Sequence, residues 1–310
     1  MQSLVRTLLG RLYDSPYLLL TLTALFWAGN VVLGRYAAGH IPPIAITFIR
    51  WSGAFILLLP LALPLLRRDW PVIRRHLPLL LALTLTGITI NNTLAYWGLQ
   101  HTEAINALLL SSGHPLFVAC WSFVLYRQRL SLWQSIGIVL SFLGVLTILT
   151  RGDLRVILDV RFNAGDLIFF MSQVVYSFYA TLVKSRPNIH PVSFLAFMTG
   201  LGTIMLSPVF AADIAAGAKL IPDLKTVLVL AYIIVFPSLI AYLFNNRGIE
   251  LIGPNRAAPF YQLIPIFGSA MAIIFLGERP ALFHAIGYTL VLTGILIGTR
   301  DRRRDAMPAE

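Results

Sequence analysis

The chain has 310 residues, of which 57% are hydrophobic and only 12% are charged, and its mean hydropathy is +0.78. Soluble domains carry roughly 25% charged residues, so this chain has too few polar side chains to cover a surface in water. The composition excludes a disordered chain, a disulfide scaffold and a coiled coil. It predicts an integral membrane protein.

The net charge of +11 comes from 24 basic and 13 acidic residues. In a soluble protein this excess would indicate nucleic acid as a partner. Here the basic residues stand in short clusters between apolar runs, as they do in cytoplasmic loops. We therefore expect a lipid bilayer and no nucleic acid. The single cysteine, Cys120, excludes Cys-based metal sites, and we expect no metal and no cofactor.

Ten apolar runs predict an all-α integral membrane protein with ten transmembrane helices. Crossing roughly 30 Å of hydrocarbon takes about 20 helical residues. The connections are short and leave no room for a separate soluble domain. The predicted spans are Tyr17–Ala38, Ile44–Leu66, Pro78–Leu99, Ala104–Leu125, Leu132–Thr150, Ala164–Lys184, Val192–Ala212, Leu224–Arg247, Asn255–Leu276 and Ala281–Thr299.

The distribution of basic residues predicts the orientation of the chain. With ten helices both termini lie on one side, and most of the 24 Lys and Arg residues fall in connections on that side. The positive-inside rule places that side in the cytoplasm. We expect a multi-pass protein of a bacterial inner membrane with both termini cytoplasmic.

The two halves of the sequence resemble each other in one register. Aligned pairs at an offset of 150 are Pro115 with Pro265, Gly98 with Gly248, and Gly144 with Gly294. Residues 1–150 and 151–310 each hold five predicted helices, the second half ending in a cytoplasmic tail. Since five is odd, the second half would enter the membrane upside down. Inverted repeats around a central cavity are typical of secondary transporters that work by alternating access.

Three motifs carry a family resemblance, and they are Ala24–Asn30, Phe48–Trp51 and Leu276–Arg279. They resemble the EamA-type branch of the drug/metabolite transporter superfamily, and the chain is most similar to the YddG-type exporters of aromatic amino acids and methionine. The first-half counterpart of the last motif is degenerate, because Gln128 stands where the family has Glu. The resemblance implies a fold of five plus five helices and amino-acid export.

The first, third, sixth and eighth helices are expected to line the cavity, because polar side chains in a bilayer usually face the bundle interior. Each carries two aromatic or amide residues three or four positions apart, on one helical face. The alternative is that these groups only hydrogen-bond one helix to another. The predicted substrate-binding residues are Trp27 and Asn30, Asn92 and Tyr96, Tyr176 and Tyr179, and Tyr242 and Asn246.

Central prolines mark the fourth and ninth helices, where Pro115 and Pro265 are predicted hinges. A proline leaves the carbonyl four residues earlier without its helical donor, so that it can accept from a substrate ammonium or simply mark a kink. Further predicted substrate-binding residues beside these prolines are His114, Tyr261 and Gln262. For His114 a hydrogen-bonding role is preferred over a proton carrier, and for Pro237 a plain kink filled by a neighbouring hydroxyl.

Charged groups are predicted to be absent from the cavity. None of the 13 acidic residues lies at the centre of a predicted helix, so the sequence offers no proton-carrying carboxylate. Arg50, inside the second helix, is expected to be a structural anchor rather than a substrate-binding residue. An uncharged cavity suits a neutral or zwitterionic substrate with an apolar part that moves down its own gradient.

The sequence predicts no catalytic residues, because it has no phosphate-binding Gly-rich loop, no HExxH and no Cys–His pair. We predict a monomeric secondary transporter that exports small-molecule substrates, namely aromatic and other large neutral amino acids. The alternative is a transporter of the same fold for a nucleobase, nucleoside, sugar phosphate or drug. An intramembrane enzyme is the alternative from another class.

Overall fold

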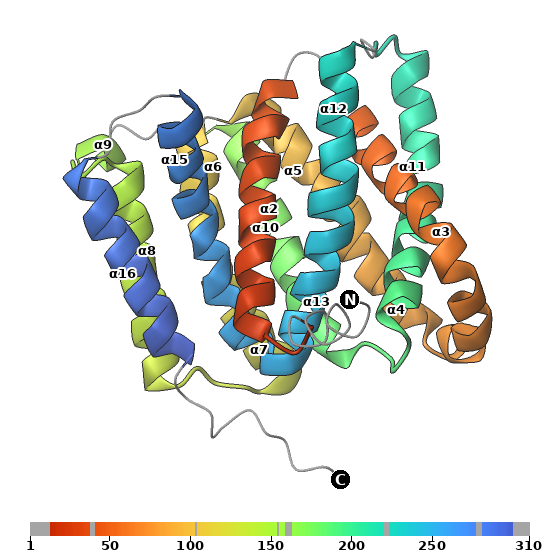
Figure 1. Ribbon diagram of the computed structural model, residues 1–310, viewed down its shortest axis with the longest axis horizontal. Coiled ribbons are helices and arrows are strands. Elements are labelled where there is room, and N and C mark those ends of the chain that lie inside the picture. Colours follow the sequence, from red (N-terminus) through yellow and green to blue (C-terminus); the bar gives the residue numbers. More distant parts are fainter. Residues whose placement is uncertain are drawn as a thin grey trace, which may run out of the picture.

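The computed structural model describes residues 13–37, 41–102, 104–153, 155–158, 163–219, 223–276 and 281–299, which form helices lying side by side (Figure 1). Within these residues there is no β-strand. Helices satisfy their own backbone hydrogen bonds, which is what a lipid solvent requires. Residues 277–279 of the family motif and the predicted cytoplasmic tail lie outside the described residues.

Within the described residues, eight helical segments are long and apolar enough to cross a membrane. They fall on eight of the predicted spans, and the protein is a multi-pass membrane protein. The eight are α2 (Pro16–Ala37), α3 (Pro43–Arg75), α4 with η1 and α5 (Leu77–Thr84, Leu85–Thr89, Ile90–His101), α8 (Leu132–Leu149), α10 with η2 (Ala164–Leu182, Val183–Ser185), α11 (Pro191–Ala215), α12 with η3 and α13 (Leu224–Ile233, Ile234–Ile240, Ala241–Ile252), and α16 (Leu282–Thr299).

The other two predicted spans are each divided into shorter helices. The span predicted over 104–125 consists of α6 (Ala104–Ser112) and α7 (His114–Tyr126). The span predicted over 255–276 consists of α14 (Pro254–Ala257), the 3-10 helix η4 (Ala258–Gln262) and α15 (Leu263–Leu276). Proline lacks the N–H that continues a helix, and it disfavours helical dihedral angles in the residue before it. The first segment is interrupted at Gly113, just before the proline-containing start of α7, and the second passes through a 3-10 turn that contains Pro259. A short helix, α9 (Arg155–Leu158), lies between the halves.

Helix α3 is longer than predicted. It continues past Leu66 to Arg75 and has 33 residues, so it measures about 50 Å and exceeds the hydrocarbon thickness. The basic residues assigned to a connection lie instead on its last turns, where arginine is a good helix former. Asp69 on this extension accepts a hydrogen bond of 2.9 Å from the backbone N–H of His190, just before α11. The extension therefore also caps a neighbouring helix.

Helices α8 and α16 pack at one edge of the molecule with their backbones in contact (Figure 1). A Cβ atom on Gly144 would lie 2.7 Å from the carbonyl oxygen of Gly287, and one on Gly137 would lie 2.5 Å from that of Gly294. Small residues allow this close approach between membrane helices, which van der Waals contact then stabilises.

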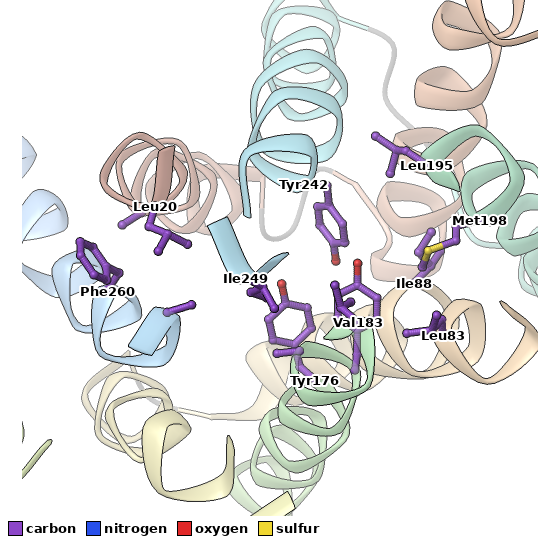
Figure 2. Packing of buried hydrophobic residues seen from close by; sticks show 14 of the residues in the cluster. Leu20, Leu83, Ile88, Tyr176, Val183, Leu195, Met198, Tyr242, Ile249 and Phe260 are labelled. Atoms are coloured by element: carbon purple, nitrogen blue, oxygen red, sulfur yellow. The ribbon is translucent and has the colours of Figure 1, made fainter. Parts of the chain in front are cut away.

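Buried side chains of both halves form the centre of the molecule. Figure 2 shows Leu20 of α2, Ile88 of η1, Met198 of α11 and two tyrosines in this cluster. The tyrosines, Tyr176 of α10 and Tyr242 of α13, extend toward each other from opposite sides (Figure 2). The core thus leads directly into a group of polar aromatic side chains.

Replacing Gly144 by alanine is expected to destabilise the protein, because the new methyl group would collide with the backbone of α16. Overpacking of this kind costs about 1–3 kcal/mol. The matched control is Gly268→Ala on α15, where a Cβ atom would meet nothing within 4 Å. The midpoint of thermal unfolding in detergent should fall for Gly144→Ala and stay unchanged or rise for Gly268→Ala. Equal midpoints would contradict the close packing.

Candidate functional site

A cavity of about 810 Å³ lies between helices of both halves. All four helices expected to line a cavity contribute to it, and η4 and α15 add to its wall. Hydrophobic side chains such as Ile46 and Phe169 complete the lining. The predicted site residues that line the cavity are Trp27, Asn30, Asn92, Tyr96, His114, Tyr176, Tyr242, Tyr261, Gln262 and Pro265.

Three predicted residues are not part of the cavity lining. Pro115 is buried near the start of α7. Tyr179 and Asn246 are buried, and the Tyr179 hydroxyl donates to Asn246 Oδ1 at 2.9 Å. These two residues were expected to contact substrate, and in this arrangement they contact each other instead. The sequence predicts which face of each helix these residues occupy, but it does not predict how far the cavity extends along that face.

The cavity is closed at one end and reaches the surface region at the other. Its lining extends to Ile41, just before α3, and to Thr102, just after α5. Tyr179 and Asn246 lie toward the opposite end, where α13 meets the start of the described chain through the ion pair of Arg247 with Asp14, 3.0 Å long. In Figure 1 the first residues of α2 and the last residues of α16 lie on the same side of the molecule as this end of α13.

Four aromatic rings form one continuous wall of the cavity. The ring centroid of Trp27 lies 5.3 Å from that of Tyr261 and 5.9 Å from those of Tyr176 and Tyr242. These rings come from α2, α10, α13 and η4, so the wall needs both halves of the chain. Such faces bind apolar groups and also attract cations through their π electrons.

Two π-helical segments, η1 and η3, were missed from the sequence. The Gly87 carbonyl in η1 accepts hydrogen bonds from the Tyr242 hydroxyl at 2.8 Å and from Asn92 Nδ2 at 3.2 Å. The Pro237 carbonyl in η3 accepts from Trp27 Nε1 at 3.1 Å. π-Helical turns frequently occur at functional sites. The sequence does contain a signal for these segments. Pro237 disrupts regular helix, and Gly87 is the residue aligned with it at the offset of 150 that relates the two halves.

A neighbouring hydroxyl binds the carbonyl that Pro237 leaves without a donor, as expected from the sequence. Proline leaves the Ile233 carbonyl, four residues earlier, without a helical donor. The Ser238 hydroxyl donates to that carbonyl at 2.6 Å.

Arg50 lines the cavity, which corrects the expectation that the cavity carries no charge. The side chain is 3% exposed, and its Nε donates to the Ser238 hydroxyl at 2.7 Å. One terminal nitrogen donates to the Tyr96 hydroxyl at 3.0 Å and to Asn92 Oδ1 at 3.3 Å. The sequence places Arg50 on α3 but not the direction of its long side chain, which turns inward rather than toward the membrane surface.

His114 is held by a neighbouring hydroxyl. Its Nδ1 lies 2.9 Å from Ser177 Oγ, and Ser177 donates its one proton to the Gln173 carbonyl at 2.7 Å. We therefore assign the Nδ1 proton to the histidine, which leaves Nε2 as an acceptor. Among the described residues, His114 Nε2 and Gln262 Oε1 are buried acceptors without a hydrogen-bond partner. His114 therefore makes a hydrogen bond inside the protein.

The chemistry of the described lining is that of binding. Its polar groups are amides, hydroxyls, one imidazole and one guanidinium, and no Asp, Glu or Cys is among the lining residues that the structure describes. In the same part of the chain, no group of three His, Cys, Asp or Glu side chains is placed to hold a metal ion.

Comparison with known proteins gives a consistent result. The EamA-like transporter family matches residues 14–150 and 163–300, which is nearly the whole chain. A crystal structure of another protein superposes with a TM-score of 0.72 at 17% identity, covering 92% of this chain and 96% of that one. At this identity the likeness shows the fold alone.

Curated relatives are similar over most of their length. The uncharacterized transporter YyaM of Bacillus subtilis is 26% identical, covering 90% of this chain and 92% of its own. An uncharacterized transporter of Archaeoglobus fulgidus is 27% identical, covering 94% and 99%. A probable terminal-alkyne amino-acid exporter of Streptantibioticus cattleyicolor is 24% identical, covering 93% and 95%.

Cysteine labelling on α10 should report the open and closed ends of the cavity. Gln173 lines the cavity, whereas Ala180, seven residues later on the same face, is 2% exposed. In a Cys120→Ala background, Gln173→Cys should react with a membrane-impermeant maleimide added to one side of the membrane. Ala180→Cys should react slowly from either side. Equal reaction at both positions would contradict a cavity closed at this depth.

Proposed function

Since the chain belongs to the EamA-like transporter family, we propose that it is a secondary transporter that exports aromatic and other large neutral amino acids. Family membership and the names of its relatives make the protein a transporter rather than an enzyme. The observation that carries the substrate proposal is the aromatic wall of Trp27, Tyr176, Tyr242 and Tyr261. A ring or thioether side chain packs well against such a surface.

The energetics of the cavity suit loose and broad selection. Burying an apolar side chain contributes roughly 1.5–3 kcal/mol, and an ammonium over an aromatic face adds about 0.5–2 kcal/mol. The unpartnered acceptors His114 Nε2 and Gln262 Oε1 offer hydrogen bonds to the same ammonium. Weak binding is appropriate for a protein that must release its cargo. The Streptantibioticus relative, named as a probable amino-acid exporter, supports this class of substrate.

We propose that residues 1–150 and 151–310 are two inverted repeats and that the two divided segments also cross the membrane, which gives ten spans. Two separate matches to one family support this division. Reciprocal contacts support it too, because a Cβ atom on Gly98 would meet Phe169 and one on Gly248 would meet Leu20. Gly98 and Gly248 are aligned residues, and so are Leu20 and Phe169. Reciprocal contacts of this kind are expected around a two-fold axis.

The orientation follows from charge. Basic residues at the end of α3, including Arg74 and Arg75, favour a cytoplasmic location for the closed end of the cavity. Both termini then lie in the cytoplasm, and the cavity opens to the outside of a bacterial inner membrane.

Two aligned amide–phenol pairs support the proposal of alternating access. At the closed end Tyr179 donates to Asn246 at 2.9 Å, and on the cavity side Tyr96 lies 3.5 Å from Asn30. Asn30 aligns with Tyr179, and Tyr96 aligns with Asn246. Each asparagine of one half therefore has a tyrosine at the aligned position of the other half. We propose that each pair seals one end in turn, with the Tyr179–Asn246 pair closed in this structure.

Energy coupling is proposed to come from the substrate gradient itself. The described lining offers no carboxylate that could carry a proton through the membrane. Among the described lining residues, His114 carries the one imidazole, and it is hydrogen-bonded to Ser177. A pH-gradient requirement that disappears in His114→Ala would overturn this part of the proposal.

Tyr179→Phe is expected to loosen the closed end, because it leaves the buried Asn246 oxygen without its donor. Such a loss costs about 1–3 kcal/mol, which shifts the equilibrium toward the opposite conformation by about 5–150-fold. The reaction of Ala180→Cys with a membrane-impermeant maleimide added on the side of the closed end should therefore be faster. Tyr96→Phe, at the aligned position of the other pair, should not accelerate it. The same response in both variants would exclude separate gates.

Transport in proteoliposomes tests the substrate proposal directly. Radiolabelled Phe, Trp and Met should exchange down a substrate gradient with no imposed pH gradient, and Trp27→Ala should reduce the rate at least tenfold by removing the centre of the aromatic wall. A host that expresses the protein should also resist toxic analogues of these amino acids. If a nucleoside or sugar phosphate moves while amino acids do not, the family assignment stands and the amino-acid proposal fails.

A further inference from the structure

Arg50 has the surroundings of an ion-binding residue. Its guanidinium is fixed by the Ser238 hydroxyl at 2.7 Å and the Tyr96 hydroxyl at 3.0 Å. It lies 4.8 Å from the ring centroid of Trp51, a fully buried side chain. These contacts tie α3 to α5 and η3 and hold the charge at the cavity wall.

Every acceptor that the structure gives Arg50 is neutral. Besides the two hydroxyls, they are Asn92 Oδ1 at 3.3 Å and the Pro237 carbonyl at 3.5 Å. The ion pairs of the described residues involve Arg68, Arg186 and Arg247, and none of them involves Arg50. A buried charge without a counter-ion is costly, and membrane proteins keep one mainly where it has a function.

We infer that Arg50 binds the carboxylate of the transported substrate and selects for it. This inference rests on the proposed function, which it deepens by assigning the charged head of the amino acid to one residue. A guanidinium is planar and presents its N–H groups as a fork that matches a carboxylate. The substrate would complete the charge balance that the described protein residues leave open.

The number of cations in the lining narrows the class of anion. No lysine and no second arginine lines the described cavity, so one positive charge is available. A monocarboxylate is neutralised by one cation, whereas a phosphate monoester, carrying nearly two negative charges, would require another. A lipophilic cation would be repelled by Arg50. The ammonium of an amino acid would bind to the aromatic wall and to the acceptors His114 Nε2 and Gln262 Oε1 beside it.

The test compares an amino acid with its amide. L-Phenylalaninamide keeps the ring and the ammonium but lacks the negative charge. Unlabelled phenylalanine and phenylalaninamide compete against radiolabelled phenylalanine for the purified protein and for Arg50→Gln, Arg50→Lys and Ser238→Ala. The matched control is Arg247→Gln, which removes an arginine paired with Asp14 at the surface.

The measured quantity is the ratio of the two inhibition constants, which does not change if only part of the protein is folded. The unmodified protein should prefer the acid by about 10–100-fold, since a hydrogen bond between charged groups has this strength. Arg50→Gln should bring the ratio close to one, and Arg50→Lys should restore part of it. Ser238→Ala should lower it a few-fold by loosening the guanidinium. Arg247→Gln should keep the original ratio.

Different failures separate the two proposals. If phenylalanine is transported but the ratio is close to one in the unmodified protein, or is unchanged in Arg50→Gln, the inference is wrong and the proposed function stands. Arg50 would then be an anchor between helices. If neither phenylalanine nor its amide binds, both the inference and the proposed function are wrong.

Discussion

The requirement that every backbone polar group find a partner in hydrocarbon governs this structure. Regular helix meets the requirement over most of the described chain, and the π-helical segments η1 and η3 directly precede α5 and α13, which line the cavity. In η1 and η3, the Gly87 and Pro237 carbonyls are taken by Tyr242 and Trp27 from other helices. The residues that shape the cavity therefore also satisfy the backbone that the irregular turns leave open, and the site and the fold depend on the same hydrogen bonds.

The two ends of the molecule differ in their hydrogen bonds between helices. At the closed end, the Tyr179–Asn246 hydrogen bond lies buried between α10 and α13, close to the surface ion pair of Arg247 with Asp14. On the cavity side the aligned pair is longer, and both of its members line the cavity. Aligned residues of the two halves thus hold hydrogen bonds of different length in the same molecule. Under the proposed alternating access, the shorter hydrogen bond marks the closed end.

Arg50 differs from the arginines that form ion pairs. Arg68, Arg186 and Arg247 each contact a carboxylate of Asp or Glu. Arg50 is buried at the cavity wall and bound only by neutral groups. Its position places one cationic group beside the aromatic wall, and the proposed zwitterionic substrate with a large side chain would use both.

The sequence alone determined the solvent, the helical class, the location of most spans and the faces that carry polar residues, because length, hydropathy and helical spacing are local properties. It placed Trp27, Tyr176, Tyr242 and Tyr261 among the site residues because polar aromatic and amide side chains stand out in apolar membrane spans and usually face the bundle interior. Only the tertiary structure decided which of the predicted site residues face the cavity. Tyr179 and Asn246 do not, because they lie at the end of the bundle that is closed. It also decided the inward turn of Arg50 and the π-helical form of η1, because both depend on acceptors and donors from helices far away in the sequence.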